Sequence, residues 1–298
     1  MALAIKETVR ILNNTEISED IFSMWLKTES ISYNAEPGQF VSLFVNDGSA
    51  LLPRPISICE TDQKERAIRL VYRIVGKGTK AFSLLGAGDT LEVMGPLGNG
   101  FMLEATGSAG NGFTSEAMGP AGNGFIPEGT GPLGNGLASG AMGTTGKMTA
   151  LVIGGGIGVP PMLELVKRLA GTRQIVLGYR DKDAFLSEEF KPYGRVYLST
   201  EDGSRGTKGN VLDAIRANGL KADIIYACGP TPMLRGIQSY AGENQIRAQL
   251  SLEERMACGI GACLGCVCKS TGVDPHTNVK NKRICKDGPV FYADEVEL

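Results

Sequence analysis

Hydrophobic and polar residues alternate over short segments in the first hundred residues. These segments are rich in β-branched and aromatic side chains and cover Lys6–Leu12, Ile21–Lys27, Gln39–Val45, Ile56–Cys59 and Ile68–Val75. Turn-forming clusters such as Glu36-Pro37-Gly38 separate them, and short strands at regular spacing are typical of a small antiparallel barrel. We therefore predict a β-barrel over residues 1–100, interrupted by a short helix at Thr79–Leu85.

The second half of the chain alternates between strand and helix patterns. Apolar runs predict strands at Thr149–Ile153, Gln174–Tyr179, Val196–Ser199 and Ala222–Ala227. The segments between and after them predict helices at Pro160–Leu169, Phe185–Phe190, Val211–Asn218 and Pro232–Gly242. This alternation is typical of an open parallel sheet with helices on both faces. We predict an α/β domain over residues 148–245.

A glycine-rich segment over residues 101–147 separates these domains. A twelve-residue unit starts at Gly95 and recurs from Gly107, Gly119 and Gly131, each time as Gly-x-x-Gly-Asn-Gly followed by Phe or Leu. One bulky apolar residue per unit buries too little to offset the backbone entropy of so many glycines. We interpret the extra copies as an exposed, mobile linker. A phosphate cradle is the weaker interpretation, because no strand precedes the glycines and no helix follows them.

Four cysteines near the C-terminus carry the most specific chemical signal. Cys258, Cys263 and Cys266 lie on one loop, and Cys285 follows at a distance. Plant-type ferredoxins hold a [2Fe–2S] cluster with this Cys-x4-Cys-x2-Cys…Cys spacing. The glycines between the cysteines let the backbone wrap closely around an inorganic core. We therefore predict a redox function and a small [2Fe–2S] domain over residues 246–298.

Structural zinc is the alternative for these thiols. Zinc sites usually pair two short Cys-x2–4-Cys knuckles, whereas here three candidates crowd onto one loop and the fourth is remote. Cys268 is a fifth candidate, which we interpret as a bystander. The single histidine, His276, stands in a polar turn, where a solvent-exposed residue is expected rather than a ligand.

The composition of the chain argues against several classes of function. The chain has 298 residues and a net charge of −2, so no basic field attracts nucleic acid or an anionic membrane. Seven cysteines, odd in number and mostly clustered, suit ligated or reduced thiols better than disulfides. The sequence shows no secretory leader pattern and no apolar run of about eighteen residues. We expect a cytoplasmic protein without a membrane segment.

Two glycine-containing turns of the α/β domain are candidates for nucleotide binding. The run Gly154-Gly155-Gly156-Ile157-Gly158 follows the first strand and opens the first helix, where free N–H groups suit a pyrophosphate. It departs from Gly-x-Gly-x-x-Gly, so a merely structural turn is the alternative. The turn Cys228-Gly229-Pro230 ends the fourth strand. Its thiol is a candidate catalytic group beside a nicotinamide or, alternatively, a small buried hydrophobe.

Polar residues of the barrel are candidates for a flavin site. Arg54 and Arg73 could clamp a diphosphate, and Ser57 could donate to a flavin ring nitrogen. Thr79 caps the short helix, whose N-terminus with Gly78 offers N–H groups to phosphate oxygens. Turn residues and surface charges are the alternative interpretation.

The order of barrel, glycine-rich nucleotide domain and ferredoxin-type cysteine loop resembles the ferredoxin–NADP reductase superfamily. Within it, the chain is similar to the electron-transfer subunits of type B dihydroorotate dehydrogenase. The matching motifs are Arg54-Pro55-Ile56-Ser57, Val71-Tyr72-Arg73, Gly78-Thr79, Gly95–Phe101, Gly154–Pro161, Cys228-Gly229-Pro230, the cysteine loop and Cys285–Phe291. Only the extra repeat copies at about 107–142 fall outside the resemblance.

The resemblance implies FAD on the barrel, held by Arg54–Ser57, Val71–Arg73 and Gly78-Thr79, and NAD(H) on the parallel sheet. It implies a [2Fe–2S] cluster on Cys258, Cys263, Cys266 and Cys285. In such enzymes an FMN-containing catalytic subunit oxidises dihydroorotate, and electrons then pass through the cluster and FAD to NAD⁺. The resemblance thus implies an electron-transfer role in pyrimidine biosynthesis, in a heterotetramer with two copies of each subunit.

Three alternatives stay open at this point. Arg180, just after the second strand, could meet a ribose 2′-phosphate, whereas Asp181 beside it favours NAD. The main rival function is the small subunit of a ferredoxin–NADP oxidoreductase or sulfide dehydrogenase. In that group an aspartate replaces one cluster cysteine, so the four cysteines favour the dihydroorotate-linked function. A zinc-stabilised nucleotide-binding regulator is the non-enzymatic alternative.

Overall fold

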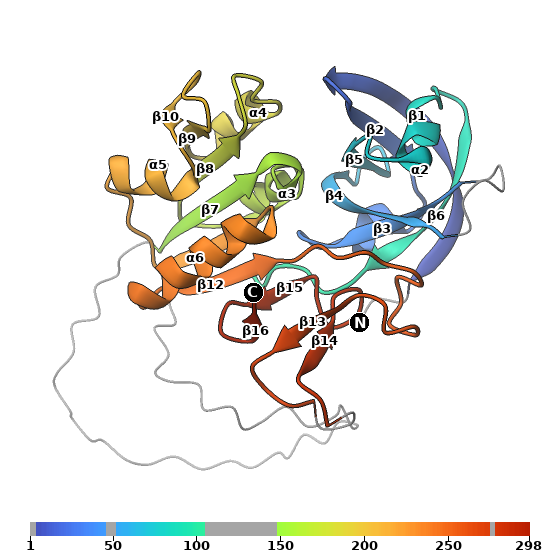
Figure 1. Cartoon of the computed structure of the whole chain (residues 1–298). Helices are drawn as coiled ribbons and strands as arrows, with labels where there is room; N and C mark the ends of the chain where they lie inside the picture. Colours follow the sequence, from blue (N-terminus) through green and yellow to red (C-terminus); the bar gives the residue numbers. More distant parts are fainter. Residues whose placement is uncertain (1–3, 46–51, 105–147, 275–277) are drawn as a thin grey trace, which may run out of the picture.

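The computed structural model describes residues 4–45, 52–104, 148–274 and 278–298. The repeat copies at 107–142 and His276 lie outside these residues, so the predictions made for them stay predictions. Figure 1 shows a barrel, a layered α/β domain beside it and a small C-terminal unit that adjoins both. The predicted fold class, an α+β protein with these three kinds of unit, is confirmed.

Antiparallel strands form the closed barrel that the alternating pattern predicted, in the order β1-β2-β5-β4-β3-β6. They are β1 (Ile5–Ser18), β2 (Ile21–Lys27), β3 (Phe40–Phe44), β4 (Arg54–Asp62), β5 (Ala67–Arg73) and β6 (Thr90–Leu97). The sequence analysis missed β6, which closes the barrel by pairing with both β1 and β3. Two short helices, α1 (Ile31–Asn34) and α2 (Lys77–Ser83), complete this part. The predicted helix at Thr79–Leu85 is therefore confirmed, two residues earlier.

The α/β domain is built on a seven-stranded sheet in the order β10-β9-β8-β7-β11-β12-β15. The parallel strands are β7 (Thr149–Gly155), β8 (Thr172–Tyr179), β9 (Arg195–Thr200), β10 (Thr207–Lys208), β11 (Ile224–Cys228) and β12 (Arg247–Ser251). The edge strand β15 (Val290–Tyr292) runs antiparallel to β12. Segment 246–298 therefore contributes two strands to this sheet besides carrying the cysteines.

Helices cover both faces of the sheet, as predicted (Figure 1). On one face α3 (Pro160–Arg168) and the short α4 (Ser187–Phe190) bury apolar side chains. On the other face α5 (Val211–Ala217) and α6 (Thr231–Glu243) do the same. Two single turns, η1 (Gly156–Gly158) and η2 (Lys191–Tyr193), follow β7 and α4.

The C-terminal unit contains a small sheet in the order β14-β13-β16. Its strands are β13 (Val267–Ser270), β14 (Asn281–Arg283) and β16 (Val296–Glu297). The cysteine loop precedes β13, and β15 leads back to the large sheet, so this unit is fixed to the α/β domain at its edge. Among the described residues, no helix is both long and apolar enough to cross a membrane.

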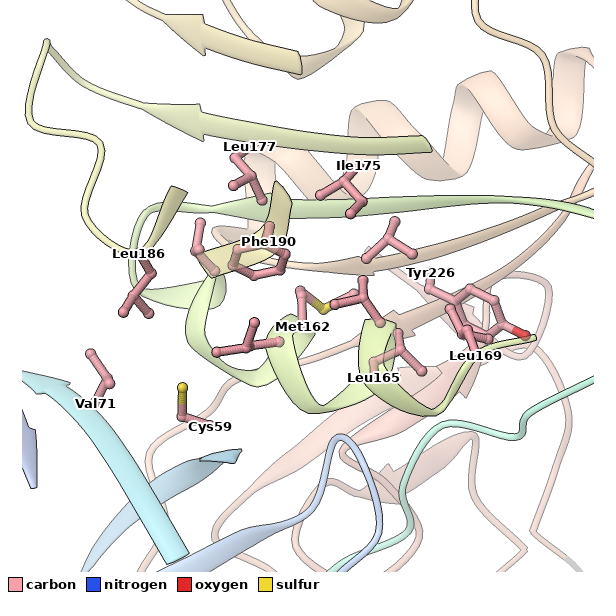
Figure 2. Packing of buried hydrophobic residues seen from close by; sticks show 14 of the residues in the cluster. Cys59, Val71, Met162, Leu165, Leu169, Ile175, Leu177, Leu186, Phe190 and Tyr226 are labelled. Carbon is pink, nitrogen blue, oxygen red and sulfur yellow. The ribbon is translucent and has the colours of Figure 1, made fainter. Parts of the chain in front are cut away.

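The barrel and the α/β domain meet where α3 packs on β4. Figure 2 shows Cys59 and Val71 of the barrel facing α3, which carries Met162 and Leu165 in the same buried cluster. Beside this apolar contact, the buried carboxylate of Glu164 accepts hydrogen bonds from the Thr61 N–H and hydroxyl, both at 2.9 Å. The interface therefore combines apolar burial with directional bonds, which fix the relative orientation of the domains.

The first copy of the glycine-rich unit joins the barrel to the C-terminal turn at residues 286–289. The Asn99 N–H donates to the Gly288 carbonyl at 2.6 Å, and the Asn99 amide donates to the carbonyls of Lys286 and Asp287. Gly98 has φ +74, and a Cβ there would lie 2.5 Å from Pro289. The glycine is required by this close approach, so the copy works as a structural joint rather than an open phosphate cradle.

The same segment is then anchored to the large sheet. The Phe101 ring meets Tyr226 edge-on, with centroids 5.8 Å apart. Gln249 brackets Met102 by accepting from its N–H and donating to its carbonyl, both at 2.9 Å. Glu104 forms an ion pair with Arg247 at 3.0 Å. The chain is therefore held on both domains up to the point where the repeat copies begin.

Candidate functional site

The four predicted cluster ligands come together at one end of the C-terminal unit. Cys258, Cys263 and Cys266 lie on the loop before β13, and Cys285 lies in the turn after β14. The Ile284 N–H donates to the Cys266 carbonyl at 2.8 Å, and the Cys285 N–H donates to the Cys266 sulfur at 3.4 Å. Folding thus brings the remote fourth cysteine to the loop, as the spacing predicted.

Backbone N–H groups point at the sulfurs of the loop. Ala262 donates to Cys258 Sγ at 3.3 Å, and Gly265 donates to Cys263 Sγ at 3.4 Å. Partial burial opposes ionisation of Cys258, but hydrogen bonds, among them those from the Ile260 N–H and the Cys263 thiol, lower its pKa to about 6. The thiolate is the form that ligates metals, so this loop is suited to ligation.

The thiols are arranged as two pairs. Cys258 is hydrogen-bonded to Cys263, while burial and then contact with Cys266 raise the pKa of Cys285 to about 12. Within the described part of the chain, no three His, Cys, Asp or Glu side chains converge on a point that could hold a single metal ion. Two pairs suit two irons that take two protein ligands each better than one tetrahedral zinc.

Cys268 differs from these four cysteines. Its thiol donates to the Lys282 carbonyl at 3.6 Å on the neighbouring strand, and burial raises its pKa. A protonated thiol that is engaged within the sheet agrees with the interpretation of Cys268 as a bystander.

The cysteine loop also touches the barrel. Gly259 has φ +71, and a Cβ there would lie 2.9 Å from the hydroxyl of Ser42. Ser42 is buried on β3 and pairs with Pro55 of β4. The residue next to Cys258 therefore lies one strand away from the segment that we predicted to hold a flavin.

The predicted flavin residues surround an opening in the barrel wall. Strands β4 and β5 pair only from Ile58 and Leu70 onward. Before that point Arg54, Pro55, Ile56 and Ser57 pair with β3 alone, and Val71–Arg73 continue past the ladder on the other side. The facing edges of these two segments therefore have no partner in the β4–β5 ladder, so a bound ligand could take up their backbone hydrogen bonds.

Helix α2 closes one end of this opening. Arg54 lies across it, since a Cβ at Gly78 would come within 2.5 Å of the Arg54 Nε. The Thr79 hydroxyl accepts from the N–H groups of Val75 and Gly76 at 2.9 and 3.3 Å, which confirms that it caps the helix. The structure therefore brings Arg54, Gly78 and Thr79 together, as a phosphate site on the barrel requires.

The three residues at the end of β5 point in different directions. Tyr72 is buried in the barrel, where it stacks on Phe22 and donates to the Asn14 side chain. Val71 is buried at the domain interface (Figure 2). Only the Arg73 side chain is exposed. Val71 and Tyr72 would therefore reach a flavin through their backbone.

A cavity of about 510 Å³ lies between the barrel and the carboxyl ends of the sheet strands. This volume is in the range of small-molecule sites, and carboxyl strand ends are where α/β sheets bind nucleotides. Arg73 and the turn Ser18–Ile21 line it from the barrel, and Gly155, Gly156 and Pro230 line it from the sheet. Arg54, Ser57 and Cys228 do not belong to its lining.

The glycines beside the cavity serve different purposes. A Cβ at Gly158 would lie 2.5 Å from the carbonyl group of Cys228, and a Cβ at Gly155 or Gly229 would clash with Met233 at 2.4 Å. Gly154 is similarly close to Val159, and Ile157 packs on the core. Gly156, with φ +53, has no heavy atom near its Cβ position. Close packing and an open ligand-facing turn are thus combined in one segment.

The Cys228 thiol is a poor nucleophile in this setting. Burial raises its pKa to about 12, although a hydrogen bond with Ser251 opposes the shift. The thiol is therefore protonated at neutral pH. Its position at the end of β11 agrees with the prediction, and its catalytic role stays a prediction.

The sequence analysis missed several residues of the cavity. Glu201 and Asn210 lie beyond the ends of β9 and β10, and their place after strands was the available signal. Ser18 and Asp183 are joined by a hydrogen bond from the hydroxyl to the carboxylate. That bond links the barrel to the α/β domain, and no local pattern in the sequence indicates it.

Comparisons with known proteins agree with this architecture. Residues 8–101 match the oxidoreductase FAD-binding domain, and residues 253–297 match the iron–sulfur cluster binding domain of dihydroorotate dehydrogenase B. The structure is similar to that of the NADH-dependent reduced ferredoxin-NADP oxidoreductase, with TM-score 0.74, 28% identity and coverage of 97% of this chain and 89% of that one. A ferredoxin NADP⁺ reductase from Neisseria gonorrhoeae shares the fold at TM-score 0.57 and 12% identity, covering 80% of this chain and 91% of that one.

Curated relatives match over nearly the whole chain. The electron transfer subunit of dihydroorotate dehydrogenase B (NAD(+)) from Fusobacterium nucleatum is 38% identical, covering 98% of both chains. The subunit of the same name from Bacillus cereus is 40% identical over 98% of this chain and 99% of its own length. The chain therefore belongs to the family of dihydroorotate dehydrogenase B (NAD⁺) electron transfer subunits.

Proposed function

We propose that the chain carries electrons from an FMN-containing dihydroorotate dehydrogenase subunit to NAD⁺ in pyrimidine biosynthesis, and that it works in the cytoplasm. The observation that carries this proposal is the contact between Gly259 of the cysteine loop and Ser42 of the barrel. This contact supports the proposal because the cysteine loop then lies one strand from the proposed flavin segment, while the cavity lies between the barrel and the sheet.

The proposed cluster ligands are Cys258, Cys263, Cys266 and Cys285. Their support is the pairing of the thiols and the N–H groups aimed at the sulfurs. Hydrogen bonds from N–H groups stabilise the ligating thiolates and tune a bound cluster. The proposed ranges are 1–100 for the flavin barrel, 101–147 for the linker, 148–245 for the NAD domain and 246–298 for the cluster domain.

The proposed FAD site is the opening between β4 and β5. When bound, FAD accepts electrons singly from an iron–sulfur centre and releases them in pairs, which a nicotinamide requires. Arg54 and the N-terminus of α2 would bind the diphosphate, and the Ser57 hydroxyl would donate to the ring. Arg73, the exposed last residue of β5, lines the nucleotide cavity, where its charge would neutralise a phosphate.

The cavity charge supports NAD(H) rather than NADP(H). Five acidic side chains line it, Glu19, Asp20, Asp181, Asp183 and Glu201, against the two arginines Arg73 and Arg180. An added 2′-phosphate would raise the repulsion inside this net negative cavity. The glycine turn with Gly156, next to the start of α3, would receive the pyrophosphate.

The partner subunit would dock beside the cysteine loop. Ile260 and Leu264 on this loop are 51% and 57% exposed, and no charged residue occurs between Met256 and Cys268. An apolar rim without charge suits a protein contact and brings the partner close to the ligands. We propose a heterotetramer with two copies of each subunit.

The decisive experiment is anaerobic co-purification with the catalytic subunit, followed by a dihydroorotate–NAD⁺ assay. The expected result is a brown complex that reduces NAD⁺ from dihydroorotate only when both subunits are present. Turnover with ferredoxin and NADP⁺ instead would favour the rival that the similarity to a ferredoxin-NADP oxidoreductase suggests. A colourless protein with one zinc per chain would support the non-enzymatic alternative.

A further inference from the structure

Arg283 connects the two segments that carry the cysteines. It is the last residue of β14, two positions before Cys285. Its Nε and one terminal nitrogen donate to the two carboxylate oxygens of Asp287 at 3.0 and 3.1 Å. Its other terminal nitrogen donates to the Gly261 carbonyl, at the centre of the cysteine loop, at 3.3 Å. One planar group thus bonds both the turn and the loop.

Gly261 is the point at which the loop is held. Its carbonyl accepts from Arg283, and its N–H donates to the Cys285 sulfur. Gly261 has φ +85, and a Cβ there would lie 2.6 Å from the Lys286 side chain. The two peptide groups that meet at Gly261 therefore face the proposed fourth ligand and the guanidinium, one each.

The turn around Cys285 is organised by the same pair. The Arg283 N–H donates to Asp287 at 2.8 Å, and the Asp287 N–H donates back to the Arg283 carbonyl at 2.7 Å. These bonds close the turn that presents Cys285. Both side chains are about one-quarter exposed, at 27% and 29%, so solvent weakens the pair less than at a free surface.

We propose that Arg283, paired with Asp287, is a positioning residue that locks the three-cysteine loop onto the Cys285 turn and balances charge beside the cluster. This inference rests on the proposed [2Fe–2S] function. Lysine cannot replace the arginine fully, because it lacks the planar fork that reaches the carboxylate and the carbonyl together.

The charge part of the proposal predicts opposite effects from the two partners. Arg283→Gln leaves the Asp287 carboxylate uncompensated, and the added negative charge disfavours reduction of the cluster. Asp287→Asn leaves the guanidinium uncompensated and favours reduction. The cluster reduction potential should therefore fall in the first variant and rise in the second. A purely structural role would not produce opposite signs.

The test uses the full chain, purified anaerobically, and measures iron release to a chelator, the spectrum of the reduced cluster and its reduction potential. Arg283→Gln should lose iron about ten-fold faster, as expected for the loss of a charged hydrogen bond, with Arg283→Lys in between. The matched control is Arg216→Gln, which breaks an exposed arginine–aspartate pair with Asp213 on α5. The control should match the parent protein, and flavin content should be unchanged in every variant.

The outcomes separate this inference from the proposed function. Iron release and potential equal to the parent in Arg283→Gln would overturn the positioning role while leaving the cluster in place. Shifts of the same sign in Arg283→Gln and Asp287→Asn would overturn the charge balance. A parent protein that binds flavin but no iron would overturn the proposed cluster itself. If Arg283→Gln does not fold, Asp287→Asn and Arg283→Lys carry the same test.

Discussion

At the scale of single residues, backbone N–H groups donate to the sulfurs of Cys258, Cys263 and Cys266, and such bonds stabilise an ionised thiol. Ala262 and Gly265 donate to the thiols of the loop, and the lowered pKa of Cys258 follows from bonds of this kind. Left-handed backbone at Gly259 and Gly261 makes this wrapping possible. The chemistry of the loop therefore depends on the glycines as much as on the cysteines.

The first prediction distinguishes a ligand from its neighbour. Cys263→Ser removes one proposed ligand, so we expect loss of most cluster iron and sulfide together with the brown colour. Cys268→Ser is the matched control, because that thiol bonds Lys282 instead, and it should keep the full cluster. Iron and sulfide analysis of anaerobic protein measures both. Equal iron in the two variants would contradict the ligand set.

The second prediction separates the two roles of the glycines that follow β7, which are close packing at Gly158 and an open turn at Gly156. Gly158→Ala places a Cβ 2.5 Å from the backbone carbonyl of Cys228, which should cost about 3 kcal/mol of unfolding free energy. Gly156→Ala meets open space but keeps a positive φ, at a cost of about 1 kcal/mol. Urea unfolding compares them, and NADH titration should show weaker binding in both. A milder effect at Gly158 than at Gly156 would refute the packing argument.

At the scale of elements, α3 is the part that relates the two cofactor domains. Its N-terminus opens beside the nucleotide cavity, and its side chains pack on β4 of the barrel. Glu164 and Arg168 of α3 bond Thr61 and Glu36 of the barrel. This helix therefore contributes both apolar and polar contacts that hold the barrel against the α/β domain beside the cavity.

The third prediction concerns this contact. Glu164→Ala removes a buried carboxylate that accepts from Thr61 and pairs with Arg168 at 2.7 Å, so we expect a loss of about 3 kcal/mol. Glu36→Gln weakens the exposed partner of the same arginine and should change stability by less than about 1 kcal/mol. Chemical denaturation measures both losses, and flavin reduction by NADH should slow only in Glu164→Ala. Equal losses of stability in the two variants would show that the burial of Glu164 does not determine the cost.

Elements with a local pattern could be predicted from the sequence, whereas those set by tertiary contacts could not. Strands β1 to β5 and α2, α3, α5 and α6 follow their hydrophobic periodicity. Strand β6, which closes the barrel by pairing with both β1 and β3, was missed because its alternation of buried Leu91 and Val93 with polar neighbours is short and ends at Gly95 and Pro96. Strands β12 and β15 lie inside the cysteine segment but complete the large sheet. Pairing partners distant in sequence leave no mark on local periodicity.

The candidate site likewise has parts that the sequence predicts and parts that only the folded structure shows. The four cysteines could be predicted as ligands because ligand spacing is itself a chemical signal, and the structure brings Cys285 to the loop as that prediction requires. The contact of Gly259 with Ser42 and the bond between Ser18 and Asp183 join residues far apart in the chain. Each uses small or common side chains whose identity does not indicate the partner. Such contacts between domains require the folded structure.

At the scale of the whole molecule, the first glycine-rich copy makes contacts that hold the units together, whereas the repeat copies at 107–142 lie outside the described residues. Asn99 and Phe101 tie the first copy to the C-terminal turn and to the sheet, and Glu104 anchors its end on Arg247. These contacts, with the α3 interface, already fix the orientation of the three units. The contacts of residues 99–104 and the α3 interface therefore set the orientation of the three units without the repeat copies.

The fourth prediction follows from this anchoring: deletion of residues 107–142 should preserve flavin, cluster and electron transfer. Glu104 pairs with the Arg247 side chain, and Arg247 and Ala150 both pair with Ile224. Two strand spacings and the reach of this ion pair put the ends to be joined within roughly 20 Å of each other. Residues 105–106 and 143–147 would remain, and a chain of that length spans on the order of 25 Å. The shortened connection therefore reaches without strain.

We expect the deletion variant to keep the parent's flavin and iron content, with NADH-dependent reduction within about twofold of the parent, because shortening a loop changes closure entropy only slowly. Asn99→Ala in the undeleted chain is the informative comparison, since it removes the bonds to the carbonyls of Lys286 and Asp287. That variant should lower thermal stability and speed iron loss, because the turn it secures carries Cys285. Collapse of flavin occupancy in the deletion variant, with Asn99→Ala unaffected, would mean that the repeat copies rather than the first copy hold the domains together.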